Sequence, residues 1–540
     1  MPADIPILTL ITFSPLLGIL VLLLLPKQQV RSLKATAIVA TLIPLLLSLW
    51  LFANFENHGN GAAYAEQATW VEAPLNKEML RGVTTYMFKF QYHMGIDGIS
   101  LPLVLLTTIV ASMAALASVH IKKRWKAFYL WFLLLEIGML GIFMARDVFL
   151  FFVFFELTLI PMFFLIGIWG GGNREKAATR FLLYNGIGSA IMLAAFVMLV
   201  STAGFNMESP DPQNVHYIYS GSYETLQANL TNPESYVNLS PEQMPGNPFY
   251  MSETMKWSIF IMLLIAFGIK LPFFPFHTWM LRVHVEAPPS IVMLHSGVLL
   301  KMGAYGLIRF GLLLFPAQAK EWALVLALLG VINLLYGAVL AFVQTELKLV
   351  LAYSSISHMG IVLLGIASLN EIGLQGAIVQ LVSHGLISAL LFLIVGSLQE
   401  RTGTTMLADL GGLARSLPFM SGIFLTAGLA SLGLPGLSGF VGEFLALLGL
   451  FDSMRIITAI AVLGVILTAV YMLRSILSIT FGAMPERFAA LRDVRLIEAL
   501  PMIALLAFII LLGVYPSILL EPMKISLNAA LAQLSMKVGG

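Results

Sequence analysis

Residues 259–275 read IFIMLLIAFGIKLPFFP. A lysine, Lys270, ends a long apolar run, and Pro272 and Pro275 follow it. Because proline removes a backbone donor and clashes with the preceding turn, this segment should be a helix that breaks directly after a buried charge. Irregular backbone at membrane depth is tolerated only where protein or a wet cavity surrounds it. The segment therefore predicts a membrane protein with a polar site in its interior.

The composition agrees with a membrane location. Of 540 residues, 59% are hydrophobic and 11% are charged, and the mean hydropathy is +0.91. A water-soluble domain of this length does not have such a composition. The first apolar run follows Asp4 rather than a basic region, so we expect a membrane span and not a cleaved signal.

Cysteine is absent from the sequence. This excludes disulfides, thiolate zinc sites and ordinary iron–sulfur clusters in the chain. Any redox chemistry that this protein serves must therefore be carried by another chain. The net charge of +2 does not support nucleic-acid binding.

The long apolar runs predict an all-α polytopic membrane protein, because each crossing needs about twenty apolar residues and barrel strands are far shorter. We expect about 14 transmembrane helices on this basis. Their ranges are 5–26, 33–55, 96–119, 127–145, 147–169, 180–202, 256–276, 285–314, 321–343, 347–369, 372–398, 418–450, 455–480 and 497–520.

A glycine–proline cluster, GLPGLSG at 433–439, interrupts the twelfth span as the prolines interrupt the seventh. Broken helices at corresponding positions of two halves mark the ion site in many transporters, although prolines can also merely kink packed helices. The breaks are five spans apart, which predicts two five-helix repeats, inverted because each has an odd number of crossings. Four parts follow: 1–126 with an external loop at 56–95, 127–314 with an external loop at 203–255, 321–481, and 482–540 with the last span and tail.

Basic residues predict the orientation, because short cytoplasmic loops are enriched in lysine and arginine. Such residues lie at 27–34, 122–126, 174–180 and 487–495, after odd-numbered spans. Residues 203–255 contain none, and carry several acidic residues instead. We therefore expect that segment and both termini on the outer side, most simply of a bacterial cytoplasmic membrane.

Seven ionisable side chains are singled out because they stand alone within long apolar stretches of the predicted spans. A charge at the bilayer centre costs a few kcal/mol, so residues of both signs at that depth point to ion movement. Burial favours the uncharged form and a nearby opposite charge favours the charged form, so such groups can take up and release protons as their neighbours change. The candidate proton-translocating residues are Glu136, Glu156, Lys270, Lys301, His358, His384 and Glu443.

Each candidate also has a structural alternative. Glu156 and Lys270 are interpreted as a switchable pair, with plain structural pairing as the alternative. For His358 and His384 a proton relay competes with hydrogen-bonded packing. Glu136 is expected either to join Glu156 or to receive protons from a neighbouring subunit.

Two further features stand out in the sequence. Lys348 is interpreted as an interfacial anchor or the mouth of a half-channel. His277, His284 and Glu286 form a cluster where a metal is conceivable, but their spacing matches no strong ligand signature, so a solvated loop or a role in proton uptake is favoured.

Several strings together resemble a known family. They are GIDGIS at 95–100, FELTLIPMFFLI at 155–166, WGG at 169–171, HVEAP at 284–288, LLK at 299–301, YSSISHMG at 353–360 and GFVGEF at 439–444. Over nearly its whole length the chain resembles the antiporter-like membrane subunits of complex I, the proton-translocating NADH–quinone oxidoreductase, and among them the subunit M group, called subunit 4 in mitochondria.

The resemblance implies two inverted repeats with broken helices 7 and 12. It implies Glu156 with Lys270 as the ion pair of a first half-channel, Lys301 as a central relay, His358 and His384 as links, and Glu443 as the terminal site. It further implies no cofactor in this chain, with FMN or an equivalent, iron–sulfur clusters and quinone in partner membrane-arm and quinone-site subunits.

The sequence departs from the family pattern at one place. Where the family usually reads WLPDAH, this chain has WMLRVH at 279–284, and His295 follows in a stretch where small residues are usual. This predicts an altered cytoplasmic mouth of the first half-channel and an added polar site at His295. The departure leaves the electron donor open.

Three functions compete at this point. The leading one is a proton-pumping subunit of a respiratory complex, and the second is a subunit of a multi-subunit sodium/proton antiporter. The string around Glu156 and the match at Asp97 favour the first. A solute transporter of unrelated mechanism is disfavoured, because the single charges are spread along the chain rather than gathered in one pocket.

Overall fold

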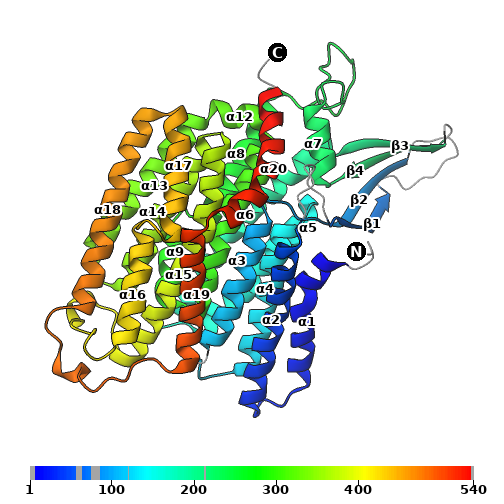
Figure 1. Cartoon of the computed structure of the whole chain (residues 1–540). Coiled ribbons are helices and arrows are strands. Elements are labelled where there is room, and N and C mark those ends of the chain that lie inside the picture. Colours follow the sequence, from blue (N-terminus) through cyan, green and yellow to red (C-terminus); the bar gives the residue numbers. More distant parts are fainter. Residues whose placement is uncertain (1–5, 56–63, 75–84, 119–120, 212–213, 537–540) are drawn as a thin grey trace.

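The computed structural model describes residues 6–55, 64–74, 85–118, 121–211 and 214–536. These residues form a broad bundle of helices, and a small sheet projects from it (Figure 1). Among the described helices, 11 are long and apolar enough to cross a membrane, and Leu101–Ala117 and Pro418–Ser431 are shorter apolar helices. The protein is therefore an integral membrane protein, as the composition predicts.

Three helices precede the first predicted repeat and correspond to the first three predicted spans. Residue 5, where the first span was expected to begin, lies outside the described residues. Helix α1 packs against α2 and α4, and α2 packs against α3. The helices are α1 (Ile7–Leu24), α2 (Val30–Ala53) and α3 (Leu101–Ala117).

The first repeat has five crossings, and the fourth is split into two helices. Its last crossing alternates α-helical and π-helical turns. The elements are α4 (Trp125–Met144), α5 (Val148–Trp169), α6 (Arg174–Ala203), α8 (Glu253–Lys270) with α9 (Thr278–Glu286), and α10 (Pro289–Leu294), η2 (His295–Leu299), α11 (Leu300–Gly306) and η3 (Leu307–Leu312).

The second repeat also has five crossings with the fourth one split, and two helices follow it. They are α13 (Ala323–Val343), α14 (Leu347–Ala367), α15 (Glu371–Thr402), α16 (Pro418–Ser431) with α17 (Ser438–Ser453), α18 (Arg455–Thr480), α19 (Leu496–Val514) and α20 (Ser517–Met536). A short helix, α12 (Pro316–Glu321), joins the two repeats. Helix α20 was not predicted, since the tail was expected only to follow the last span.

Both predicted helix breaks are confirmed. Helix α8 ends at Lys270, and the backbone groups that the break frees find new partners. The Trp279 indole N–H donates to the Ile269 carbonyl at 3.1 Å, and the Phe274 amide donates to Asn333 Oδ1 on α13 at 2.7 Å. A side chain of the second repeat therefore supplies a hydrogen-bond partner for backbone at the break in the first repeat.

The second break, between α16 and α17, follows from glycine. Gly433 and Gly436 have φ of +80° and +91°, a region that residues with a Cβ rarely adopt. The chain turns there and re-enters a helix at Ser438, whose hydroxyl lies 2.7 Å from that of Ser383 on α15. This turn places Glu443 early in α17, against the middle of α15.

Small residues bring α13 and α14 together, which fixes the position of His358. A Cβ at Gly337 would lie 2.6 Å from the Ser357 amide nitrogen, and one at Gly360 would lie 2.6 Å from the Gly330 carbonyl oxygen. Because lipid tails are as apolar as leucine, helices in a membrane associate through such close packing.

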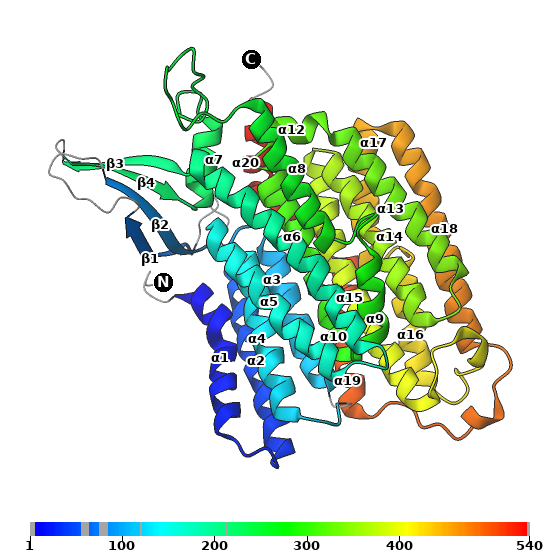
Figure 2. The same cartoon turned by 180° about the vertical axis from the view of Figure 1, so that it is seen from behind.

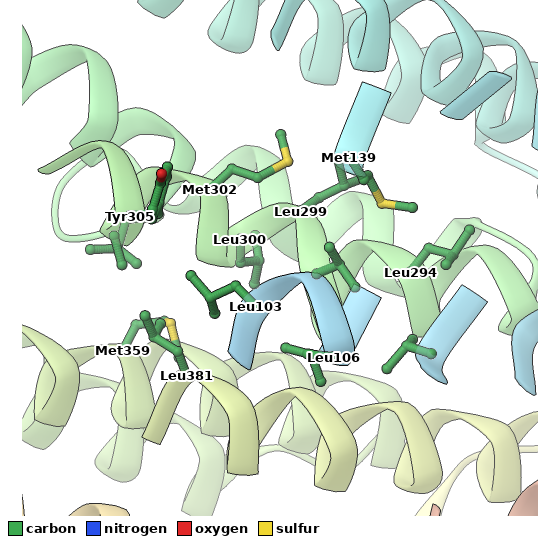
Figure 3. Packing of buried hydrophobic residues seen from close by; sticks show 14 of the residues in the cluster. Leu103, Leu106, Met139, Leu294, Leu299, Leu300, Met302, Tyr305, Met359 and Leu381 are labelled. Carbon is green, nitrogen blue, oxygen red and sulfur yellow. The ribbon is translucent and has the colours of Figure 1, made fainter. Parts of the chain in front are cut away.

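An apolar core separates the polar residues from lipid. Figure 3 shows Leu103 and Leu106 of α3 lying between the leucines of α10, η2 and α11 on one side and Leu381 of α15 on the other. The apolar part of helix α15 is completely buried, and it includes the polar side chains of Gln380 and His384. Polar residues on it therefore meet protein partners rather than lipid.

A four-stranded sheet was not predicted. The strands are β1 (Glu66–Pro74), β2 (Thr85–Met94), β3 (Phe205–Asp211) and β4 (Asn214–Ser220), in the order β1-β2-β4-β3. The pairs β1–β2 and β3–β4 are antiparallel, and β2 pairs with β4 in parallel. The described parts of the two predicted external segments thus form one structure, while 56–63, 75–84 and 212–213 lie outside the described residues.

The first and last described helices meet the sheet end of the bundle. Glu66 of β1 accepts hydrogen bonds from the Leu8 and Thr9 amides of α1, and Ser526 of α20 accepts one from the Gly98 amide that follows β2. The loops that carry most of the basic residues gather at the opposite end (Figures 1 and 2).

A buried cluster of charges joins the sheet end to the first repeat. Asp97, before α3, contacts the Arg146 guanidinium at 3.1 Å and also pairs with Arg309 of η3. The three side chains are at most 7% exposed. Nearby, burial lowers the pKa of His93 in β2, so that its imidazole stays neutral beside Glu224.

We expect Asp97→Asn to destabilise the protein by about 3–5 kcal/mol, because it removes the charge of the one carboxylate that the buried Arg146 and Arg309 guanidinium groups share. Thermal unfolding of the purified protein in detergent measures the effect. The control is Glu72→Gln, whose carboxylate is 47% exposed and 4.0 Å from Lys89 and should contribute roughly 0–1 kcal/mol. Equal unfolding temperatures for both variants would contradict the role of the cluster.

Candidate functional site: a row of buried ionisable side chains

Lys301 lies at the centre of the molecule. It is fully buried in α11, directly after the π-helical turn η2. π-Helical turns are rare and are often found at functional sites. The Lys301 ammonium donates to the Ser296 carbonyl on that turn and lies 2.8 Å from His384 Nδ1 on α15. The widened turn therefore supplies an acceptor for the buried lysine, and the second acceptor comes from the other repeat.

The row continues through the second repeat. The imidazole rings of His384 and His358 have centroids 5.3 Å apart, and His358 Nδ1 lies 3.2 Å from Glu443 Oε1. All of these side chains are at most 5% exposed. The structure thus brings together four of the predicted site residues, Lys301, His384, His358 and Glu443, in that order.

Two small cavities flank His384. One is lined by serines of α14, α15 and α16, and the other by His358, Gln380, Ser431 and Glu443. Each offers about 10 Å³ of space for the centre of a water molecule, which is close to the room that one water needs. Short gaps in the row can therefore be bridged by single waters bound to polar groups.

The surroundings of His358 include a residue that the sequence did not single out. Gln380 on α15 places its amide nitrogen 3.2 Å from His358 Nδ1, and His358 Nε2 lies 3.3 Å from the Ser431 hydroxyl. Gln380 Oε1 is buried without a hydrogen-bond partner. Gln380 is uncharged, so the pattern of isolated ionisable side chains that located the row did not include it.

In the first repeat the predicted partners face each other without touching. Lys270 is 1% exposed, and its ammonium has no hydrogen-bond partner and lies over the Phe155 ring, 4.8 Å from the centroid. Glu156, the residue after Phe155, acts on Lys270 electrostatically, but no ion pair within 4 Å joins them in the described part of the chain. The pair is thus a charge interaction across a gap.

A pair of histidines lies between Lys270 and Lys301. His284 Nε2 on α9 is 2.9 Å from His295 Nδ1 on η2, and both rings are fully buried. The charge of Lys301 acts on both rings, and that of Lys270 acts on His295. His284 Nδ1 and His295 Nε2 have no hydrogen-bond partner in the protein. The predicted added polar site at His295 is therefore part of the row, paired with His284.

The remaining candidates lie apart from this row or at its side. Glu136 on α4 is fully buried, and neither of its oxygens has a hydrogen-bond partner. Lys348 is 9% exposed and donates to the Val285 carbonyl of α9, beside His284. Glu136 thus remains a separate buried acid, whereas Lys348 sits next to the first helix break.

The predicted cluster of His277, His284 and Glu286 does not converge. His277 contacts the Tyr336 hydroxyl at 3.2 Å, and Glu286 accepts from the Asn173 amide at 3.0 Å. Across the described ranges, no three histidine, cysteine or acidic side chains come close enough to hold a metal ion. His277, His284 and Glu286 therefore bond to three different partners, Tyr336, His295 and the Asn173 amide.

Comparison with known proteins gives the family. The model described as "NADH:quinone oxidoreductase/Mrp antiporter, TM" matches residues 145–468, and the one for the amino terminus of NADH-ubiquinone oxidoreductase chain 4 matches 75–145. The chain belongs to the NADH:quinone oxidoreductase/Mrp antiporter family. The predicted resemblance is thereby confirmed.

Relatives and solved structures cover almost the whole of this family member. It is 35% identical to the NADH-quinone oxidoreductase subunit M of Rickettsia felis, over 98% of this chain and 99% of the relative. Respiratory complex I from Thermus thermophilus contains a similar chain with a TM-score of 0.79 and 30% identity, covering 99% and 100%. The Mrp complex of Dietzia contains one with the same fold, at a TM-score of 0.77 and 20% identity, covering 98% and 100%.

The two lysines of this family member should respond differently to removal of charge. Lys270→Met removes a buried ammonium that has no hydrogen-bond partner, so it leaves no hydrogen-bonding group unpaired and should cost less stability than Lys301→Met. Lys301→Met leaves the Ser296 carbonyl and His384 Nδ1 without their donor, at a cost of about 1–3 kcal/mol for each group. Unfolding temperatures of the two variants, measured side by side in detergent, should differ in that direction, and the opposite order would rule out this account of the lysines.

Proposed function

We propose that the chain is a proton-translocating membrane-arm subunit of a respiratory NADH-quinone oxidoreductase. The names of its relatives support this assignment. The chain carries no redox centre itself in this proposal, and partner subunits hold FMN or an equivalent, iron–sulfur clusters and quinone. Proton movement here is coupled to quinone reduction there.

The observation that carries the proposal is the buried row Lys301, His384, His358 and Glu443. Lys301 Nζ lies 2.8 Å from His384 Nδ1, and the His384 and His358 rings are in contact. His358 Nδ1 lies 3.2 Å from Glu443 Oε1. Imidazole both accepts and donates a proton, so two histidines between a lysine and a carboxylate form a path along which a proton can move in steps. A purely structural cluster would not need four titratable groups in sequence with small cavities beside them.

The first repeat supplies the other part of the path. A proton held by Lys270 is stabilised or released according to the charge of Glu156, because the two groups interact without a fixed hydrogen bond. The His284–His295 pair offers a link from Lys270 to Lys301. Lys348, beside His284, is a candidate for uptake from the basic end of the bundle.

We propose further that the two five-helix repeats, 127–314 and 321–481, are the two half-channels that meet at Lys301. The end with the basic loops is then the cytoplasmic side, and the sheet and both termini lie outside. The bacterial relatives favour the cytoplasmic membrane as the location. Glu136, apart from the row, is assigned to exchange with a neighbouring subunit.

A subunit of a multi-subunit sodium/proton antiporter is the second candidate, since the matching family model covers both kinds of complex. Purification of the native assembly separates the two. Iron–sulfur and quinone-site subunits should co-purify with this chain, and vesicles that contain the assembly should acidify when NADH or another donor reduces quinone. Co-purification with small membrane antiporter chains alone would support the second candidate.

Glu156→Gln should largely abolish coupled turnover and leave the assembly intact, because the amide is similar in shape but cannot change its charge. Proton translocation and quinone reduction are measured in the same vesicles. The matched control is Glu136→Gln, which removes a buried acid outside the row and should have a milder effect. Unchanged coupling in Glu156→Gln would remove Glu156 from the mechanism.

His295 gives a test of the link between the lysines. Both His295→Leu and His295→Gln should slow coupled turnover by about a hundredfold or more, since neither residue can carry a relayed proton. Glutamine can still hydrogen-bond to His284, so recovery in His295→Gln alone would mean that the pair is structural. His277→Gln, at the break between α8 and α9 and bonded to Tyr336, is the control and should keep its activity.

A further inference from the structure

Two neighbours compete for one nitrogen of His358. The Gln380 amide nitrogen and Glu443 Oε1 each lie 3.2 Å from His358 Nδ1. An imidazole nitrogen either carries a proton and donates, or has a lone pair and accepts. It donates when it faces the carboxylate, and it accepts when it faces the amide N–H. Both contacts cannot be hydrogen bonds in one protonation state, and in this structure Nδ1 is bonded to the amide while Glu443 Oε1 has no hydrogen-bond partner.

Close packing between α15 and α17 holds the Gln380 side chain beside His358. It is 1% exposed on α15, and a Cβ at Gly442 of α17 would lie 2.5 Å from its Oε1. The absence of a side chain at 442 lets the two helices approach closely around the amide. Its oxygen is buried and has no hydrogen-bond partner, an arrangement that is costly unless another orientation uses that oxygen.

The two ends of a carboxamide have the same shape but opposite hydrogen-bonding roles. With the amide nitrogen toward His358, the neutral imidazole is favoured. Rotation of the amide by half a turn presents Oε1 instead, which accepts from a protonated Nδ1 and gives the orphaned oxygen a partner. The small cavity lined by His358, Gln380 and Glu443 lies where this rotation takes place.

We propose that Gln380 is a positioning residue whose amide orientation sets when His358 passes its proton to Glu443. In the transfer, the His358 Nδ1–H bond breaks and an O–H bond forms on the Glu443 carboxylate. The imidazolium becomes a neutral imidazole and the carboxylate becomes a carboxylic acid. The Gln380 N–H then donates to the vacated lone pair of Nδ1, which opposes the return of the proton.

This inference rests on the proposed function and concerns its last internal step. The titratable groups that face His358 are Glu443 on α17 and His384 on α15. Lys301 stands behind His384, and Tyr471 of α18 acts on Glu443. Apart from Glu443, none of them is placed against His358 Nδ1, so Gln380 is the uncharged group that can either donate to that nitrogen or accept from it.

The test uses the whole purified complex in vesicles, with proton translocation and quinone reduction measured over a range of pH. Gln380→Met keeps the volume and removes both polar ends. We expect proton translocation at pH 7 to fall about fivefold to tenfold, the size expected from loss of one ordinary hydrogen bond, together with a displaced pH profile of coupled turnover. The matched control is Gln375→Met on the same helix, where the glutamine bonds to Glu371 outside the row.

A second variant tests the proposal even if Gln380→Met fails to assemble. Gln380→Glu has nearly the same shape, but its carboxylate only accepts hydrogen bonds and therefore holds the proton on His358. It should reduce translocation more than Gln380→Met does. Wild-type translocation and an unshifted pH profile in Gln380→Glu would overturn the inference. If wild-type vesicles reduce quinone without moving protons, the proposed function fails instead, so the two failures are distinct.

Discussion

The structure depends on the cost of holding an ionisable group away from water. An unpaired charge in a medium of low dielectric is so unfavourable that each such group must find a partner, change its protonation state or be reached by water. Lys301 finds its partners on a π-helical turn and on α15, whereas Lys270 and Glu156 face each other across a gap. At Lys301 the irregular backbone of η2 helps to meet this requirement, because its Ser296 carbonyl accepts from the ammonium.

The same constraint explains why the two repeats act as one body. Asn333 of α13 closes the break after Lys270, Lys348 of α14 caps the carbonyl of Val285, and His384 of α15 accepts from Lys301. Each of these bonds joins one repeat to the other at a polar position within an otherwise apolar interface. The Asp97 cluster performs a comparable role at the sheet end, where two arginines from different parts of the chain share one carboxylate.

The sequence allowed prediction of features that have a local physical cause. Proline and glycine clusters located both breaks, and isolated charges in apolar runs located the members of the row. Contacts between distant segments were beyond such reasoning. The pairing of β2 with β4, the docking of α20 and the meeting of His284 with His295 depend on the angles at which helices leave the breaks. Gln380 escaped notice because an uncharged amide does not belong to the ionisable side chains that marked the row, and Arg309 because it stood near the expected end of a span.

Helix α15 contributes both Gln380 and His384, which lie about one helical turn apart on one buried rod. Their partners, Lys301 and His358, belong to other helices. A sliding of this rod by the rise of a single residue, about 1.5 Å, would change the 2.8 Å contact at His384 and the amide contact at His358 at the same moment. The two contacts therefore depend together on the axial position of one helix, and neither can be adjusted by its backbone alone.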